Sequence, residues 1–268
     1  MTKVSGAITT TLLVGLVVWI GCDLAVRGAG GFYPGYLFEN PKDLGRAGGI
    51  GPVLISTGVV VSLAVALAVL ISLPSAIVYV ELLGSNWLSS AYQALLDVGV
   101  GVPRIVWGLF GGVLFGGFMG FGFSMLTGVI TLACLLAPIL ATGFIAGLRA
   151  VDPTLRAQCA ALGVSRWTTV WTHTLPAARP ALVASTALAV ARGCGDAAAL
   201  LFTAGVTTEL PRSLLDPGAT LAVFVFHLLS TVPGGQKAAY TAAAVLFFVT
   251  FGIQVGIACA NRRERFAW

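Results

Sequence analysis

Four charged side chains interrupt stretches of the chain that are otherwise apolar. Arg192 and Asp196 are four residues apart, so on a helix they share one face and can form an ion pair. Asp97 and Arg104 are seven residues apart and would also share a helical face. At the centre of a bilayer a charged residue costs about 2.5–3.5 kcal/mol on insertion scales, so such residues usually face a cavity or one another. These four residues are therefore the first candidates for chemistry.

Two interpretations of these charges are open from the residues alone. Arginines that line a path favour an anion, and the planar guanidinium matches the oxygens of phosphate well. Glycines beside both pairs would let a neighbouring backbone or a ligand come close. The alternative is a set of internal ion pairs that only hold helices together. The first interpretation makes Arg192, Asp196 and Arg104 the residues of a transport path, with Asp97 nearer the membrane surface.

Composition assigns the chain to the bilayer. Only 9% of its residues are charged and 57% are hydrophobic, whereas about a quarter of the residues in a soluble domain are charged. The net charge of +5 does not indicate nucleic-acid binding, because the cations are dispersed. The five cysteines are far apart and have no metal or redox spacing, so we expect neither disulfides nor a metal. The sequence also has no Gly-x-x-x-x-Gly-Lys-Ser/Thr loop, so we expect no cofactor in this chain and no ATP chemistry of its own.

The apolar runs predict an all-α membrane domain. A spanning helix needs about 20 mainly apolar residues. The run Leu95–Leu148 has 54 residues. As one helix it would reach about 80 Å, so it must fold back, and Gly116, Gly117, Gly120 and Gly122 are suited to the turn. We therefore expect one permease domain over residues 1–268, with six spans at about 7–26, 52–80, 95–119, 123–148, 180–203 and 238–260.

The distribution of cations predicts the orientation. We interpret the first span as a retained anchor rather than a signal peptide, because no clean cleavage site follows Val26. With the N-terminus inside, eight Lys and Arg residues lie in inner segments and five in outer segments. The tail Arg262-Arg263-Glu264-Arg265 directly after the last span strengthens this bias. An even number of spans then places both termini in the cytoplasm.

The inner segment 149–179 is expected to form a helical hairpin. A first helix, Pro153–Leu162, would begin after the capping residue Asp152 and end at Gly163. A second helix, Arg166–Thr174, would follow and would end before Pro176 and Pro180. Its apolar side chains are suited to a groove on another protein, and they are Trp167, Val170 and Trp171. The alternative is an amphipathic hairpin that lies on the bilayer surface.

This hairpin resembles the EAA loop of ABC-importer permeases, in which Glu-Ala-Ala precedes a glycine, nine further residues and Ile-x-Leu-Pro. Gly163 and Leu175-Pro176 match that spacing, and residues 160–167 (Ala-Ala-Leu-Gly-Val-Ser-Arg-Trp) are similar to the sequence usual in the family at these positions. Ala157-Gln158-Cys159 stand where Glu-Ala-Ala is usual, and His173 replaces the isoleucine. The missing glutamate implies weaker or rearranged coupling. The resemblance implies an ATPase-coupling loop that includes Gly163, Arg166, Trp167, Val170, Leu175 and Pro176.

Two further segments resemble the PstA family, the permeases of phosphate ABC importers. Residues 192–205 are similar to the family's Arg-x-x-Gly-Glu-Thr-x-x-Leu-Leu-Phe-Thr-Ala-Gly, and residues 101–111 to its Gly-Val-Pro-Ser-Ile-Val-x-Gly-Leu-Phe-Gly. In that family the arginine and carboxylate of the fifth span are associated with phosphate passage, which the resemblance carries over to Arg192 and Asp196. Here Asp196 shortens the family's glutamate, Ala197 replaces its threonine and Arg104 replaces its serine. We hypothesise that the extra guanidinium compensates for the lost hydroxyl.

The resemblance implies a type I importer permease with the MetI-like fold in a bacterial or archaeal cytoplasmic (inner) membrane. It would work with a second, PstC-like permease, two copies of a PstB-like ATPase that binds ATP and Mg²⁺, and an external PstS-like phosphate-binding protein. A permease for sulfate, molybdate or tungstate would share the fold and the inner loop, and a diverged paralogue would share both motifs. A stand-alone carrier is the rival from another class. It would be favoured by inverted repeats with broken helices, which the sequence does not display.

Overall fold

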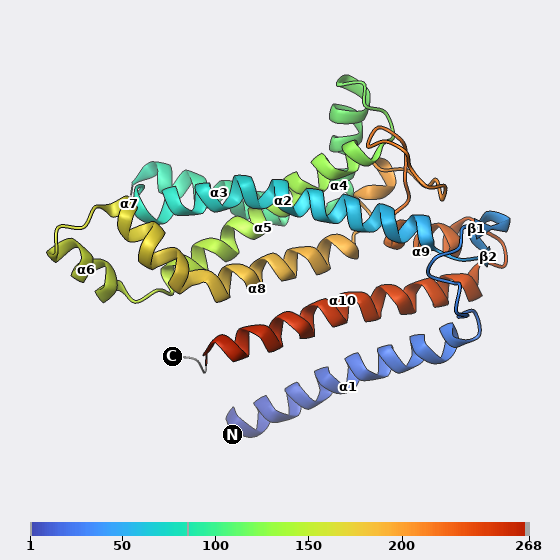
Figure 1. Cartoon of the computed structure of the whole chain (residues 1–268), viewed down its shortest axis with the longest axis horizontal. Helices are drawn as coiled ribbons and strands as arrows, with labels where there is room; N and C mark the ends of the chain where they lie inside the picture. The colour runs from blue at the N-terminus through green and yellow to red at the C-terminus, as the bar shows by residue number, and fades with distance from the viewer. Residues whose placement is uncertain (1, 85, 266–268) are drawn as a thin grey trace.

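The computed structural model describes residues 2–84 and 86–265, which form a bundle of long helices (Figure 1). The expected all-α membrane fold is confirmed. Five helices of the described part are long and apolar enough to cross a membrane, or six if one bent pair counts as a single span. The helices are α1 (Thr2–Ala29), α2 (Gly51–Glu81), α3 (Trp87–Gly101), α4 (Arg104–Gly111), α5 (Met125–Arg149), α6 (Pro153–Ala161), α7 (Arg166–Thr169), α8 (Leu175–Cys194), α9 (Leu221–Ser230) and α10 (Gln236–Arg265).

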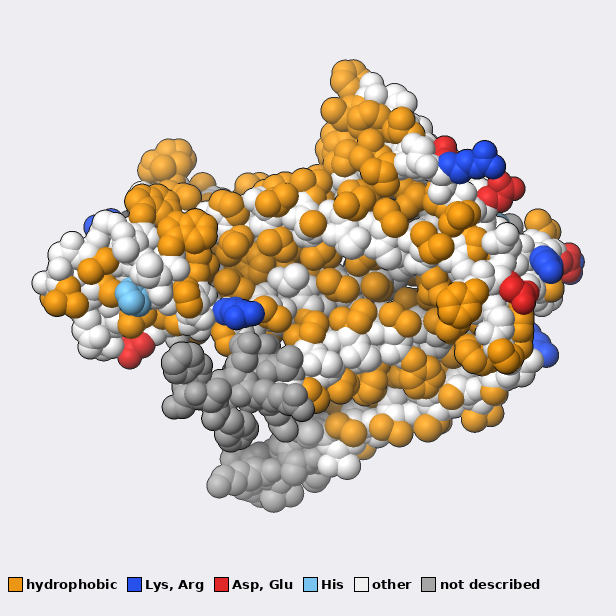
Figure 2. Space-filling view, in the orientation of Figure 1, with side chains coloured by type: hydrophobic (Ala, Val, Ile, Leu, Met, Phe, Trp, Pro, Cys, Tyr) orange, Lys and Arg blue, Asp and Glu red, His pale blue; other side chains and the backbone are white. Residues whose placement is uncertain are grey.

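The helices run along the long axis of the molecule. The start of α1, the end of α10 and the hairpin α6–α7 lie toward one end, and α9 lies toward the other (Figure 1). Hydrophobic side chains cover most of the face between, while most charged side chains in view lie toward the two ends (Figure 2). This distribution is that of a bundle that crosses a bilayer along its long axis. The side chains of the Arg262-Arg263-Glu264-Arg265 tail lie outside the described part.

The core of the bundle is the contact between α2 and α5. Apolar side chains of both helices interlock there, and they include Val60, Ala64, Leu132, Leu136 and Phe144, each at most 1% exposed. By contrast, α1 packs against α10 and leaves much apolar surface uncovered, with Trp19 at 67% exposure. The core is thus formed by the middle of the chain, and α1 is attached at its edge.

The expected third span, 95–119, is broken into two helical parts in the structure. The structure has α3 and then α4 with a π-helical continuation, Gly112–Phe118, and these two parts are bent by 95° at Val102-Pro103. Proline lacks the N–H that would continue the helix, and it disfavours helical backbone at the preceding residue. Val102 is accordingly extended, with φ −64° and ψ 129°. As a result α4 turns away from the direction of the bundle (Figure 1).

The expected fold-back after this segment lies at two of the four glycines named. Gly120 and Gly122 have φ of +78° and +62°, values that residues with a Cβ rarely adopt. The other two, Gly116 and Gly117, lie inside the π-helix. α5 then begins at Met125, with the Ser124 side chain accepting from the Thr127 N–H as a cap.

The prediction that Pro176 and Pro180 end the second loop helix is wrong. Helical structure runs without a break from Arg166 to Cys194, through a π-turn at Val170–Thr174. In that turn the N–H of Leu175 bonds to the carbonyl of Val170, five residues earlier. The wider turn comes directly before Pro176, where the proline ring would otherwise meet the preceding turn of an α-helix. The fifth span correspondingly ends at Cys194 rather than at residue 203.

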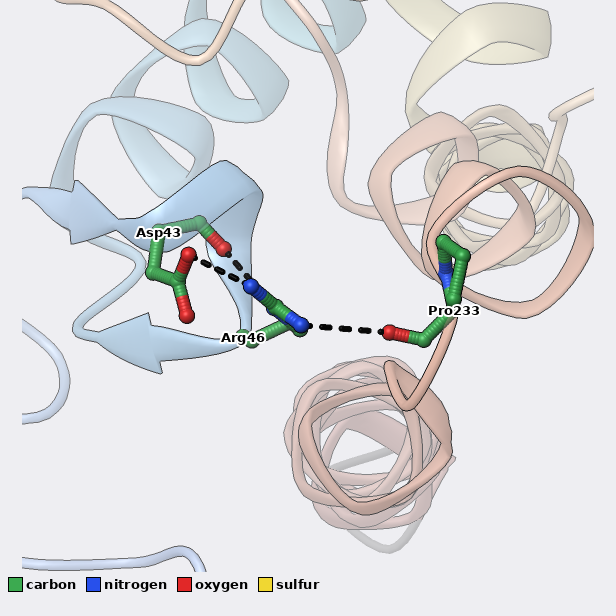
Figure 3. A network of polar contacts seen from close by, with 3 residues as sticks. All are labelled: Asp43, Arg46 and Pro233. Atoms are coloured by element: carbon green, nitrogen blue, oxygen red, sulfur yellow. Dashed lines mark hydrogen bonds and ion pairs between the residues drawn. The ribbon is translucent and has the colours of Figure 1, made fainter.

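The outer end of the bundle is held by short connections. A two-stranded antiparallel hairpin, β1 (Pro41–Lys42) with β2 (Ala47–Gly48), follows α1. Arg46 Nη2 lies 2.6 Å from Asp43 Oδ1, and Arg46 Nη1 donates to the carbonyl of Pro233 at 3.5 Å (Figure 3). The arginine therefore joins the loop after α1 to the turn before α10.

α4 lies very close to the segment that follows α8. A Cβ on Gly108 would lie 2.8 Å from the Cα and the carbonyl oxygen of Ala199. A Cβ on Gly112, one turn further, would lie 2.6 Å from the carbonyl oxygen of Phe202. Glycine at these positions lets two backbones touch, which fixes α4 against residues 199–202.

We expect Gly108→Ala to lower the free energy of unfolding by about 1–3 kcal/mol, the usual cost of overpacking a tight contact. The matched control is Gly58→Ala, because Gly58 is also helical and a Cβ there would meet nothing within 4 Å. Alanine favours a helix over glycine by up to about 1 kcal/mol, so the control should be neutral or stabilising. Thermal unfolding of the purified protein in nanodiscs measures both. Equal melting temperatures for the two variants would contradict the close packing.

Candidate functional site

Asp196 is the buried charge at the centre of the candidate site. Its side chain is 0% exposed. Its Oδ1 accepts a hydrogen bond at 3.0 Å from the N–H of Ala199, the residue directly before the short 3₁₀ turn Leu200–Phe202. Its Oδ2 lies 3.5 Å from Nη1 of Arg104 and has no hydrogen-bond partner within the described chain. The carboxylate is therefore held on one oxygen and only loosely paired on the other.

Arg104 reaches this carboxylate from the break in the third span. It is the first residue of α4, directly after Pro103, and its side chain is 39% exposed. A cation at a helix N-terminus is opposed by the helix dipole. The ion pair with Asp196 offsets that cost and joins the start of α4 to the end of α8. The expectation that Arg104 and Asp97 share one helical face is wrong, because the helix is interrupted between them.

Arg192 is the second guanidinium of the site. It lies in the last turn of α8, where a cation is favoured by the helix dipole, and its Nε is buried without a hydrogen-bond partner in the part of the chain described here. The ion pair that the spacing of Arg192 and Asp196 allowed is not formed, and Asp196 pairs with Arg104 instead. α8 ends at Cys194, so Asp196 no longer lies on the helical face that carries Arg192. The spacing alone allowed this pairing. The only sign of a helix end between the two residues is the pair of glycines, Gly193 and Gly195.

The site therefore contains two guanidinium groups and one carboxylate, a net charge of +1. Because Asp196 is paired with Arg104, the charge left over belongs to Arg192. A buried N–H donor without a partner costs free energy until it finds an acceptor. This arrangement suits a small anion rather than a cation. Asp97 takes no part in it, since its side chain is exposed and accepts from Gln93 of its own helix at 3.4 Å.

The inner hairpin presents a separate apolar surface. Asp152 caps α6 by accepting from the Thr154 N–H at 2.9 Å, and this hydrogen bond lowers the pKa of its carboxyl. The chain reverses at Gly163, where φ is +73°, and Ser165 caps α7. The exposed apolar side chains beyond the cap are Trp167 at 51% and Trp171 at 63%.

The predicted loop residues divide into two faces. Arg166, Trp167 and Pro176 are exposed, as is Gly163 at the bend, but Val170 is 1% exposed and belongs to the core, with Leu175 packed against it. Residues 167 and 171 are one turn apart on the exposed face of the helix, whereas 170 and 174 lie on its buried face. Val170 is thus not available to a partner. Sequence reasoning missed Leu162, which is 81% exposed at the tip of the hairpin.

We expect Arg104→Ala to lower the free energy of unfolding by about 1–3 kcal/mol, because it leaves the buried carboxylate of Asp196 without a counter-charge. The double variant Arg104→Ala/Asp196→Asn removes that charge and should recover part of the loss. Arg46→Ala is the control, since it breaks an ion pair whose side chains are 41% and 57% exposed. Such surface pairs contribute about 1 kcal/mol or less. Thermal unfolding in nanodiscs ranks the three, and an Arg104 variant as stable as the Arg46 variant would refute the role of the pair.

Comparisons with known proteins agree with the fold. Residues 68–261 match the family model "Binding-protein-dependent transport system inner membrane component". A probable ABC transporter permease, YqgI of Bacillus subtilis, is 27% identical over 90% of this chain and 85% of its own length. The phosphate transport system permease protein PstA 1 of Mycobacterium tuberculosis is 30% identical over 82% of this chain and 73% of its own. The corresponding PstC of Haemophilus influenzae is 27% identical over 89% and 82%.

A solved structure supports the architecture independently. A chain of the MetNI methionine ABC transporter in an inward-facing conformation superposes with a TM-score of 0.67 over 80% of this chain and 95% of that one. At 16% identity this likeness speaks for the fold alone. The bundle, the inner hairpin and the family match over residues 68–261 agree. The chain belongs to the family of binding-protein-dependent transport system inner membrane components, the membrane-spanning permease subunits of ABC importers.

Proposed function

We propose that this chain is a permease subunit of an ATP-driven importer of inorganic phosphate. The observation that carries the proposal is the charge arrangement at the end of α8. Asp196 is neutralised by Arg104 at 3.5 Å, and the Nε of Arg192 is buried without a partner. A guanidinium in that state is a hydrogen-bond donor for an oxyanion. The relatives named PstA and PstC, phosphate transport permeases by name, support the choice of phosphate.

The free oxygen of Asp196 favours phosphate over the other oxyanions. At neutral pH inorganic phosphate keeps at least one proton, and its P–OH group can donate to Oδ2, which has no donor now. Sulfate, molybdate and tungstate carry no proton at that pH, so they would place a bare oxygen against a carboxylate. A polar site built for a donor rejects analogues that lack it. The anion must still leave the site, which the loose ion pair permits.

The inner hairpin is the docking site for the motor in this proposal. Leu162, Trp167 and Trp171 would enter a groove on a cytoplasmic, PstB-like ATPase that binds ATP and Mg²⁺. Two copies of that ATPase would serve this chain and a second, PstC-like permease, which together enclose the path. A PstS-like phosphate-binding protein would deliver the anion at the opposite end, near α9 and the β1–β2 hairpin. Both termini are then cytoplasmic, as α6–α7 lies at their end of the bundle (Figure 1).

We expect Arg192→Ala to reduce phosphate uptake at least tenfold in proteoliposomes that hold the complete complex and phosphate-loaded binding protein, because the anion loses its unshared donor. The control is Arg212→Ala, since Arg212 is an exposed arginine of the outer loop. ATPase activity without binding protein should be unchanged in both variants. Uptake that is equal in the two variants would remove Arg192 from the path, and stimulation of the wild type by a sulfate-loaded receptor alone would replace phosphate as the substrate.

We expect the double substitution Trp167→Ser/Trp171→Ser to weaken co-purification of the ATPase at least tenfold, because both indole rings would be buried at the contact. The control is Trp87→Ser, which removes an indole that is 75% exposed on α3. Affinity purification in mild detergent, followed by quantification of the ATPase band, measures the effect. If the ATPase is retained equally by both variants, the hairpin is not its docking site.

A further inference from the structure

Arg156 of α6 joins three elements of the fold. Its Nε and Nη2 each lie 3.1 Å from Glu81 Oε1, at the last residue of α2. The same Nη2 donates to the carbonyl of Leu148 at 2.9 Å, in the last turn of α5, and Nη1 donates to the carbonyl of Val151 at 3.3 Å. The two side chains are only 25% and 13% exposed. One guanidinium thus holds the hairpin to the ends of two long helices.

The two helix ends need such a cation. The last carbonyls of a helix have no partner within it, and Arg156 supplies donors to this part of α5. A carboxylate at a helix C-terminus is opposed by the dipole, so Glu81 at the end of α2 is unfavourable unless it is paired. Planar guanidinium geometry allows all of these contacts at once, which a lysine could not provide. These contacts therefore require arginine rather than lysine at position 156.

This contact stands next to the departure in the EAA-like motif. Ala157 occupies the place of the usual glutamate, so the hairpin has no carboxylate of its own there. In this chain the carboxylate at the base of the hairpin comes from α2 instead, as Glu81. The cation that meets it, Arg156, is the neighbour of the altered position. The base of the hairpin is therefore fixed by an ion pair between helices rather than by a charge within the motif.

A continuous series of contacts leads from Arg156 to the charged site. α2 and α5 share the core of the bundle. At the other end of α5, a Cβ on Gly128 would lie 2.9 Å from Ala204 Cβ and 3.3 Å from Leu200 Cδ2, in and just after the 3₁₀ turn Leu200–Phe202. A Cβ on Gly111 of α4 would overlap the side chain of Thr131 on α5. A displacement of α5 along its axis must therefore move both partners of the Arg104–Asp196 pair.

We propose that Arg156 is the positioning residue through which displacement of the hairpin is transmitted to α2 and α5, and that its ion pair with Glu81 replaces the missing motif carboxylate in coupling. This inference rests on the proposed function only in taking an ATPase as the source of the displacement. Arg156 touches neither the anion nor the ATP. It makes α6 and the inner ends of α2 and α5 one rigid body.

The test uses spin labels at Ala160→Cys on α6 and Leu70→Cys on α2, both exposed, in a chain whose native cysteines are replaced by alanine. In nanodiscs with the complete complex, the wild-type distance should change by about 1 Å or less between the nucleotide-free and vanadate-trapped states, less than a typical helix shift. Arg156→Ala should broaden the distance distribution and let the distance change on trapping. The control is Arg179→Ala, which removes an exposed arginine of α8 and should resemble the wild type.

The second readout is the amount of phosphate imported per ATP hydrolysed. Losing a coupling contact should lower it by about 3- to 30-fold in Arg156→Ala, while the ATPase remains bound. Glu81→Gln keeps an acceptor for the guanidinium and should lose less. If Arg156→Ala does not assemble, Arg156→Ala/Glu81→Ala leaves no unpaired buried charge and must show the same uncoupling. An unchanged distance distribution and import ratio in either variant that lacks Arg156 overturns the proposal.

The two hypotheses fail in different ways. If no ATPase binds the wild type, the proposed function is wrong. The labelled permease alone, in nanodiscs, then still reports whether Arg156 fixes α6 to α2. If the ATPase binds and phosphate is imported, but removal of Arg156 changes neither readout, only the coupling role is lost.

Discussion

The burial of Asp196 is the constraint on which this architecture depends. A carboxylate without exposure, in a segment surrounded by lipid-facing helices, must find a counter-charge or a set of donors. It finds one donor in the N–H of Ala199, which is possible only because α8 ends two residues earlier. It finds its cation in Arg104, which can reach it only because Pro103 interrupts the third span. The helix end and the helix break are therefore two parts of one solution.

The close backbone packing around this pair serves the same purpose. Glycines at positions 108 and 112 bring α4 onto the segment 199–202, so the ion pair is held by shape as well as by charge. A loosely packed α4 would let water or lipid reach Asp196. The ion pair itself is loose. Arg104 Nη1 lies 3.5 Å from Asp196 Oδ2, and that oxygen has no hydrogen-bond partner among the described residues. A rigid surrounding and a loose central pair are the combination expected of a site that must bind and release an anion.

Sequence reasoning singled out the candidate residues but not the pairing of Arg104 with Asp196. Mid-membrane charge is rare enough to single out Arg192, Asp196 and Arg104 without any structure. The pairing depends on where helices end, and helix boundaries are the least predictable feature of a sequence. A proline such as Pro103 indicates a possible break, but only tertiary packing decides between a kink and a bend of 95°.

The α6–α7 hairpin shows the opposite case, in which the sequence predicts a helix end that the structure does not have. Pro176 and Pro180 would ordinarily end a helix. Here the helix continues through both, because a π-turn directly precedes Pro176. No periodicity in the sequence indicates a π-turn. At the start of this turn Val170 lies in the core, while the two tryptophans are exposed. The all-α membrane fold followed from apolar length alone, since it depends on composition rather than on register.

The continuity of α7 with α8 has a mechanical meaning. If helical structure stopped at Pro176, a push on the hairpin would be absorbed in a flexible joint. Here the exposed indoles and Arg192 lie on one run of helix, Arg166–Cys194, with the π-turn as its only irregular point. Arg156 anchors the other arm of the hairpin to α2 and α5, and α5 packs against the 3₁₀ turn Leu200–Phe202. A displacement of the hairpin therefore reaches Arg192 along one route and the Arg104–Asp196 pair along another. One route ends on the Arg192 guanidinium and the other on the pair that contains the Asp196 carboxylate. Any difference between their movements therefore changes the distance between these two groups. Under the proposed function, that separation is what would hold or release the anion.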